Sequence, residues 1–161
     1  MSRMIWITIL ILLVPVIAHS QLVQWTIESG GNGHWYELVY SETPITWEEA
    51  EAYAESGGGH LATISSAEEN SWIFETLVIP LAPVSTIGVF LGGFHNESSP
   101  DYSEPAGGWE WVTGEPWIYE AWRDGEPNDL GDRGNYLEYA NGPAQIIGWN
   151  DTGNGPEDVH Y

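Results

Sequence analysis

Cysteine is absent from this chain, and basic residues are almost absent. Without cysteine there are no disulfides, thiolate metal ligands or cysteine nucleophiles, so side-chain packing must hold the fold. Lys and Arg number 3 against 24 Asp and Glu, which gives a formal net charge of −21. Such an acidic surface repels phosphate backbones and anionic lipids, which argues against nucleic acid or a membrane surface as a partner. A bound divalent cation would relieve part of the self-repulsion, although plain solubility accounts for most of these acids.

Long apolar runs are also absent, with one exception at the N-terminus. Residues 4–18 are nearly all apolar and follow Arg3, and Ala18 and Ser20 are small residues at the two positions that a signal peptidase reads. We therefore expect a signal peptide over residues 1–20, a mature domain over residues 21–161, and a secreted protein that is not inserted in a membrane after cleavage. The alternative is an uncleaved anchor, but the run is shorter than the roughly 20 residues that span a bilayer.

Tryptophan and tyrosine are abundant, with 10 and 8 residues. They bury large areas per residue, so a domain without disulfides can still hold a core. We expect Trp117, Trp122 and Trp149 to pack in this core rather than to stack against a ligand. No nucleophile motif, phosphate-binding loop or cofactor fingerprint is found, and we therefore expect a protein that is not an enzyme.

Two helices are predicted in the first half of the chain. Each begins with capping-box spacing, in which a Ser or Thr is followed three residues later by Glu: Thr46 with Glu49, and Ser66 with Glu69. The glycines at 57–59 end the first helix, and two prolines after residue 79 end the second.

Short strands and long loops are predicted for the rest. Residues 35–40 are rich in aromatic and bulky side chains, and residues 60–64 form a short strand-like link. Residues 89–93 predict a buried strand, and residues 109–112 alternate as a half-buried strand should. Residues 114–134 are rich in Gly, Pro and Asp, which indicates a long irregular loop of the kind that carries function.

A hairpin is predicted at the C-terminal end. Residues 135–140 and 144–149 flank Asn141-Gly142-Pro143, which is a strong turn signal. The shortest pairing across this turn places Asn135 opposite Trp149. The residues that follow Trp149 then lie at the mouth of the long loop.

Two pairs of oxygen-bearing side chains meet there. Glu126 and Asn128 belong to the loop, while Asn150 and Asp151 follow the hairpin, with Gly134 expected roughly opposite Asn150. Four oxygen donors without His or Cys suit a hard cation, and Ca²⁺ best. The sequence therefore predicts one site built from two distant segments.

The motifs occur in the order found in one known family, and the chain resembles a C-type lectin-like domain, in particular the disulfide-free bacterial versions. The resemblance implies an α+β fold with two helices, two small antiparallel sheets and a long loop region. It rests on the following segments: Gly33-His34-Trp35-Tyr36-Glu37, Trp47-Glu48-Glu49-Ala50, His60-Leu61-Ala62-Thr63-Ile64, Ser66-Ala67-Glu68-Glu69-Asn70, Phe90-Leu91-Gly92-Gly93, Trp109-Glu110-Trp111-Val112-Thr113-Gly114, Trp122, Glu126-Pro127-Asn128 and Trp149-Asn150-Asp151.

The resemblance also implies a function. Glu126, Asn128, Asn150 and Asp151 would bind one Ca²⁺ and hydrogen-bond a sugar that completes its shell, and the Glu126-Pro127 bond would be cis. The order of acceptor then donor in Glu-Pro-Asn is similar to the version that selects mannose- and glucose-type glycans. We therefore expect a secreted, calcium-dependent carbohydrate-binding module whose weak single site is used in several copies.

One position departs from the family pattern. The family has a further Glu ligand eight residues after the first, and that position is Gly134 here. Asp132 and Glu138 are the acids that could substitute, and Gly134→Glu is expected to raise calcium affinity because carboxylate count tunes it. The alternative function is a calcium-independent module that binds a protein or another surface.

Overall fold

The computed structural model describes residues 17–19, 21–41, 43–81, 88–131, 133–140 and 147–155. The predicted turn at 141–143, most of the predicted signal peptide and Asp132 lie outside these ranges. Within them, no helix is long and apolar enough to cross a membrane.

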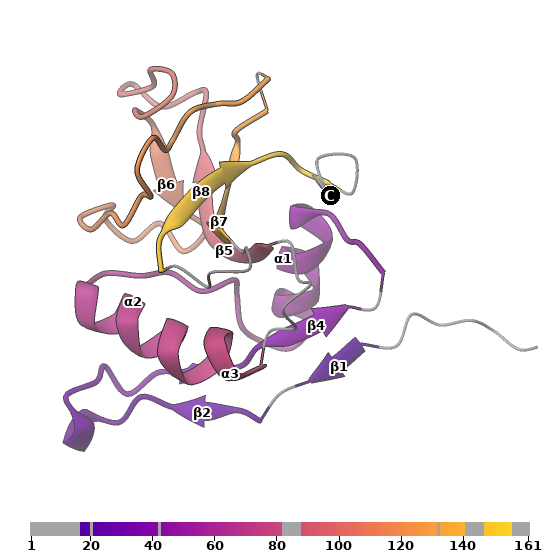
Figure 1. Cartoon of the computed structure of the whole chain (residues 1–161), viewed down its shortest axis with the longest axis vertical. Helices are drawn as coiled ribbons and strands as arrows, with labels where there is room; N and C mark the ends of the chain where they lie inside the picture. Colours follow the sequence, from indigo (N-terminus) through magenta and orange to yellow (C-terminus); the bar gives the residue numbers. More distant parts are fainter. Residues whose placement is uncertain are drawn as a thin grey trace, which may run out of the picture.

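Both predicted helices are present (Figure 1). Helix α1 is Trp47–Ser56, and its capping box is complete: Thr46 Oγ1 accepts the Glu49 N–H at 3.1 Å, and the Glu49 carboxylate accepts the Thr46 N–H at 2.9 Å. Helix α2 is Ala67–Ile73. It continues through the π-helical turn η2, Phe74–Val78, into the short helix α3, Ile79–Leu81.

The N-terminal part forms two short antiparallel ladders. Strand β1, Ile17–His19, pairs with β4, Val39–Ser41, and β2, Val23–Gln24, pairs with β3, Trp35–Tyr36. A 3₁₀ turn, η1, covers Ile27–Ser29. The single strand predicted over residues 35–40 is thus divided between two ladders.

The site-bearing part is one four-stranded antiparallel sheet in the order β6-β5-β7-β8. Its strands are β5 Gly88–His95, β6 Trp109–Trp111, β7 Tyr136–Ala140 and β8 Trp149–Thr152. Figure 1 shows this sheet with the long loops beyond one end and helix α2 on the opposite side of the molecule. The predicted α+β fold with two helices and small antiparallel sheets is confirmed.

The strand-like link predicted over residues 60–64 is wrong in detail. No strand is assigned there, although the Gly92 N–H donates to the Ala62 carbonyl at 2.9 Å. Ile64 is almost fully buried. The segment therefore packs as an extended core chain that is joined to β5 by this backbone hydrogen bond in place of a ladder.

The hairpin register also differs from the predicted one. Trp149 pairs with Tyr139, and Asn150 pairs with Glu138 rather than with Gly134. The Tyr139 hydroxyl and the Trp149 indole N–H both donate to the Asn70 side-chain oxygen, at 2.8 and 3.0 Å. Contacts with helix α2 therefore favour this register.

Trp149 lies at the centre of the core, as predicted. Its side chain is 0% exposed, and its ring makes edge contacts with those of Trp111, Trp117 and Trp122 at centroid distances of 5.7 to 5.9 Å. Trp117 and Trp122 are partly buried against the same core, which confirms their predicted packing role. Because Trp149 is fixed on all sides, the two residues that follow it leave the core at a defined point.

Candidate cation site

The loop segment of the site turns sharply around Pro127. The Glu126-Pro127 bond is cis, as the resemblance implied, and the Glu126 N–H donates to the Arg123 carbonyl at 3.0 Å. Asp129 then adopts the left-handed conformation with φ 45°. This turn brings the backbone N–H groups of Asn128 and Asp129 to face β8.

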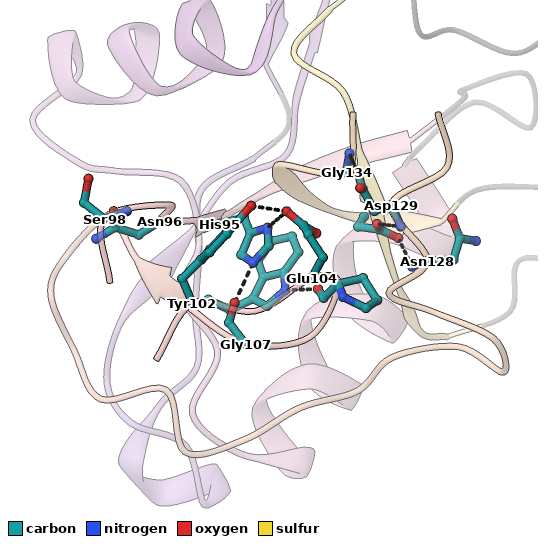
Figure 2. Close-up of polar contacts among 12 residues, drawn as sticks. His95, Asn96, Ser98, Tyr102, Glu104, Gly107, Asn128, Asp129 and Gly134 are labelled. Atoms are coloured by element: carbon teal, nitrogen blue, oxygen red, sulfur yellow. Dashed lines mark hydrogen bonds and ion pairs between the residues drawn. The ribbon is translucent and has the colours of Figure 1, made fainter. Parts of the chain in front are cut away.

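Asp151 joins the two predicted segments. Its side chain is 7% exposed, and its carboxylate accepts the N–H groups of Asn128 at 3.0 Å and Asp129 at 2.6 Å. Asp129 in turn accepts the Gly134 N–H at 2.8 Å, as Figure 2 shows. The predicted convergence of the loop with β8 is therefore present, and Asp151 is the residue that holds it.

Glu126 carries a buried oxygen without a partner. Among the residues that the structure describes, its Oε2 has no hydrogen-bond partner, although the side chain as a whole is half-buried. Burial and, after it, the neighbouring Asp151 carboxylate together raise the pKa of Glu126 to about 7, against the opposing effects of Arg123 and Asn128. Arg123 and Asn128 therefore compensate only part of the cost of a negative charge on Glu126.

Asn150 uses its amide group within the protein. Its Nδ2 donates to Glu138 Oε1 at 3.1 Å and to the Asp151 carbonyl at 2.8 Å. Both donor hydrogens are engaged, so the amide oxygen is the group of Asn150 that can serve as a ligand to a cation.

Gly134 leaves the space that the Asp151 carboxylate occupies. A Cβ at Gly134 would lie 2.0 Å from Asp151 Oδ2 and 2.9 Å from the Asp129 Cα. The expectation that Gly134→Glu raises calcium affinity does not fit this geometry. Any side chain there would displace the carboxylate that holds the loop to β8, and we now expect the affinity to fall.

A second polar cluster fixes the neighbouring loop and was not predicted. His95 at the end of β5 stacks on Trp109 with centroids 5.1 Å apart, and its Nε2 lies 2.5 Å from the Gly107 carbonyl oxygen. His95 Nδ1 lies 3.6 Å from Glu104 Oε1, which also accepts the Tyr102 hydroxyl (Figure 2). The five histidines show no pattern in the sequence, so only the fold reveals this contact.

The residues present suit a calcium ion by their chemistry. Glu126 and Asp151 supply carboxylates, Asn128 and Asn150 supply amide oxygens, and the unpartnered oxygen of Glu126 is the kind of group that a cation satisfies. No three His, Asp or Glu side chains form a ready metal-binding group in the described part of the chain. A calcium site here would therefore depend on the amide oxygens as well as on the acids.

Comparison with known proteins places the chain in a family. The Lectin C-type domain matches residues 43–152. The chain is 36% identical over 107 residues to a type-2 ice-structuring protein of Brachyopsis segaliensis, covering 66% of this chain and 51% of that protein. It is 29% identical over 114 residues to ladderlectin of Oncorhynchus mykiss, covering 71% and 51%. The matched segment thus spans about half the length of these relatives.

Solved structures are similar as well. A calcium-independent type II antifreeze protein is 27% identical with a TM-score of 0.50, covering 70% of this chain and 76% of that one. The C-type lectin domain of murine dendritic cell inhibitory receptor 2, solved in complex with N-glycan, is 25% identical with a TM-score of 0.53, covering 71% and 80%. The chain therefore belongs to the C-type lectin domain family, whose members are binding domains rather than enzymes.

Proposed function

We propose that this chain is a calcium-dependent carbohydrate-binding module for mannose- or glucose-type glycans. The observation that carries the proposal is the joint formed by Asp151 with the backbone of Asn128 and Asp129, beside the unpartnered oxygen of Glu126. These groups come from two segments far apart in sequence, and both segments match the family motifs for a calcium and sugar site.

In this proposal Glu126, Asn128, Asn150 and Asp151 hold the ion. Bound Ca²⁺ supplies open coordination positions that two neighbouring sugar hydroxyls can fill. The acids accept hydrogen bonds from those hydroxyls, and the Asn128 amide donates to them. The Asn150 amide is already engaged by Glu138, so Asn128 is the side-chain donor that faces the sugar.

The type of sugar is proposed from the order of these groups. Glu126 is an acceptor and Asn128 a donor, which is the order of the mannose- and glucose-type motif. The murine neighbour solved with N-glycan supports glycans as the class of ligand. A single shallow site binds sugar weakly, so display in several copies would provide useful avidity.

Calorimetric titration with CaCl₂ tests the ion first. The full chain is expected to bind one Ca²⁺ with a dissociation constant on the order of 10⁻⁴ to 10⁻³ M, as in extracellular modules. Glu126→Gln is expected to weaken binding at least tenfold, whereas Glu55→Gln, an exposed acid on α1, serves as the matched control. No heat of binding at millimolar calcium would refute the proposed ion site.

Sugar binding is tested next, with methyl mannoside and methyl galactoside in calcium and in chelator. We expect binding of the mannoside that disappears with chelator. The double variant Glu126→Gln/Asn128→Asp is expected to shift the preference towards the galactoside, since it exchanges acceptor and donor. An unchanged preference would contradict the assignment of these two residues.

A second candidate function is a calcium-independent module for a protein or another surface. It is favoured by Arg123, whose charge lowers the pKa of Glu126 and so acts as an internal counter-ion. It also agrees with the calcium-independent antifreeze protein among the structural neighbours and with the ice-structuring relatives. Glycan binding that survives chelator, or thermal hysteresis of the purified chain, would favour this candidate.

We also propose that the protein is secreted after cleavage behind Ser20. The apolar run ahead of that position supports this, and the relatives include ladderlectin and ice-structuring proteins. Cleavage there would remove β1 and leave the edge of β4 unpaired. N-terminal sequencing of the exported protein tests the proposal, and a chain that still begins at Met1 would refute it.

A further inference from the structure

We propose that Asn96 is an N-glycosylation site and that the second glycosylation motif of the chain, at Asn150, is not. An N-linked glycan is attached to Asn in the pattern Asn-x-Ser/Thr, where x is not Pro. The sequence contains this pattern twice, as Asn96-Glu97-Ser98 and as Asn150-Asp151-Thr152. The two motifs are equivalent in the sequence, but their surroundings in the fold differ. The inference goes beyond the binding of sugars and rests on the proposed export of the chain.

The first motif lies on a turn at the surface. Strand β5 ends at His95, and Asn96 follows it directly, at the start of the loop that leads to β6. Glu97 and Ser98 are exposed, and Asn96 is partly exposed. Figure 2 shows Asn96 and Ser98 apart from the contacts that His95 makes with the rest of the loop. All three residues that a glycosyl transferase reads are therefore within its reach.

The hydrogen bonds of Asn96 leave its amide nitrogen available. Its backbone N–H donates to the Gly108 carbonyl at 2.9 Å, and its carbonyl accepts the Ser99 N–H at 2.9 Å. Its side-chain Oδ1 accepts the Ser98 N–H at 2.9 Å. Within the described ranges, Asn96 Nδ2 has no hydrogen-bond partner. The contacts that form the turn therefore use only groups that glycosylation leaves intact.

The second motif has the opposite properties. Asn150 lies within β8 and pairs with Glu138 of β7. Its Nδ2 donates both hydrogens, to Glu138 Oε1 at 3.1 Å and to the Asp151 carbonyl at 2.8 Å. A glycan replaces one of these hydrogens, and its first sugar would overlap the acceptor that the hydrogen now contacts. Asp151, the middle residue of this motif, is 7% exposed. A glycan on Asn150 is therefore incompatible with the fold.

The donor that Asn96 would need is an oligosaccharide linked to a lipid diphosphate. In the transfer, Asn96 Nδ2 forms a bond to the anomeric carbon of the first sugar, while the bond from that carbon to the diphosphate oxygen breaks. The lipid diphosphate leaves, and one amide proton passes to a base of the transferase. Nδ2 keeps its other hydrogen, and Oδ1 keeps the hydrogen bond from Ser98, so the product retains the contacts of the turn.

Expression of the full chain in eukaryotic secretory cells tests the inference, with peptide mapping of the exported protein. We expect a glycan at Asn96, and its removal by peptide N-glycosidase should leave Asp at that position. Ser98→Ala destroys the motif but keeps the backbone N–H that Asn96 accepts, so we expect complete loss of the glycan from a folded chain. Thr152→Ala destroys the second motif in the same way and should leave the glycan unchanged. Thermal unfolding shows that both variants fold.

The outcomes separate this inference from the proposed export. An exported chain without a glycan at Asn96, or with one at Asn150, would overturn the inference. In a second arm, a signal peptide of known function precedes the full chain, so entry into the secretory pathway does not depend on residues 1–20. A glycan at Asn96 in that arm alone would support the inference and refute export by residues 1–20. No glycan in either arm would overturn the inference.

Discussion

At the scale of single residues, Asp151 matters most for the geometry of the candidate site. One carboxylate binds the backbone of two loop residues and closes the candidate site. Trp149, two residues earlier on β8, is held by the core, so the position of Asp151 is set by packing and not by the ligand. The loop therefore has a fixed attachment before any ion binds.

Asp151→Asn tests this attachment. The amide group would place N–H donors against one of the two backbone N–H groups, and an unsatisfied buried donor costs about 1–3 kcal/mol. We expect that loss of unfolding free energy in urea with chelator present, together with loss of calcium binding. Asp124→Asn, an exposed acid of the same loop, is the control. Wild-type stability of the Asp151 variant would show that the loop is held by other contacts.

Gly134→Ala tests the space next to it. The added methyl group would overlap Asp151 Oδ2 and crowd the Asp129 Cα, and overpacking of this kind costs about 1–3 kcal/mol. We expect lower stability and weaker calcium binding. Gly59→Ala is the matched control, because its Cβ would make only ordinary contact with the Ala54 carbonyl at 3.8 Å. Tighter calcium binding in the Gly134 variant would restore the view that an acid belongs there.

At the scale of elements, the helices were predictable because their starting signals are local. Thr46 and Glu49 satisfy each other within one turn, and no distant residue is needed. The second capping box is only half formed. Ser66 accepts the Glu69 N–H, but the Glu69 carboxylate accepts instead from Ser65 and from the Tyr36 hydroxyl, which is brought by β3. Tertiary contacts therefore engage the Glu69 carboxylate, which the local pattern had assigned to the cap of helix α2.

Glu69→Gln is expected to destabilise the junction of α2 with β3. Glu69 is 3% exposed, and each of its oxygens accepts two donors, from Asn32 and Tyr36 on one side and from Ser65 on the other. The amide of Gln would replace one acceptor with a donor, at a cost of about 1–3 kcal/mol. Urea unfolding measures it, with the exposed neighbour Glu68→Gln as control. Equal stability of the two variants would contradict a structural role for Glu69.

The candidate site was predictable in part for the same reason. The Glu-Pro-Asn and Trp-Asn-Asp motifs are local, and the turn signal between them was enough to predict that the two segments meet. The register of β7 with β8 was not predictable, because Asn70 of helix α2 helps to decide it through Tyr139 and Trp149. The position of Glu138 follows from that register and from Gly88, a glycine on another strand. When the register of two strands depends on residues elsewhere in the fold, the sequences of the two strands do not predict it.

At the scale of the whole molecule, the proposed calcium site would make calcium and pH act on the same acidic groups. The formal net charge is −21, and the charges of Asp151 and Glu126 act on Glu138, with Arg123 acting in the opposite direction. Most of the other acids are spread over the surface, where water screens them. Protonation of the acids in the candidate site should therefore have a measurable effect on the pH dependence of stability.

The sign of the pH effect follows from the raised pKa values. Glu126 has a pKa of about 7 and Glu138 of about 8, against an ordinary value of 4.5. An acid with a raised pKa in the folded state binds its proton more tightly there than in the unfolded chain. Its stabilising contribution is therefore complete below pH 4.5 and is lost as the pH rises towards 8. Without calcium, we expect the unfolding temperature to fall across this window.

If the proposed site binds calcium, the ion should reverse the trend, because a bound cation competes with the protons of the ionised acids. Unfolding temperatures measured from pH 5 to 8.5, in chelator and in saturating calcium, test this expectation. The gain from calcium should be small at pH 5 and largest above pH 8. The double variant Glu126→Gln/Glu138→Gln keeps all other acids, so it should show a flatter decline in chelator and a reduced response to calcium. If the unfolding temperature of the variant in chelator falls as steeply with pH as that of wild type, general surface repulsion would account for the pH dependence. Ionisation of Glu126 and Glu138 would then not be its cause.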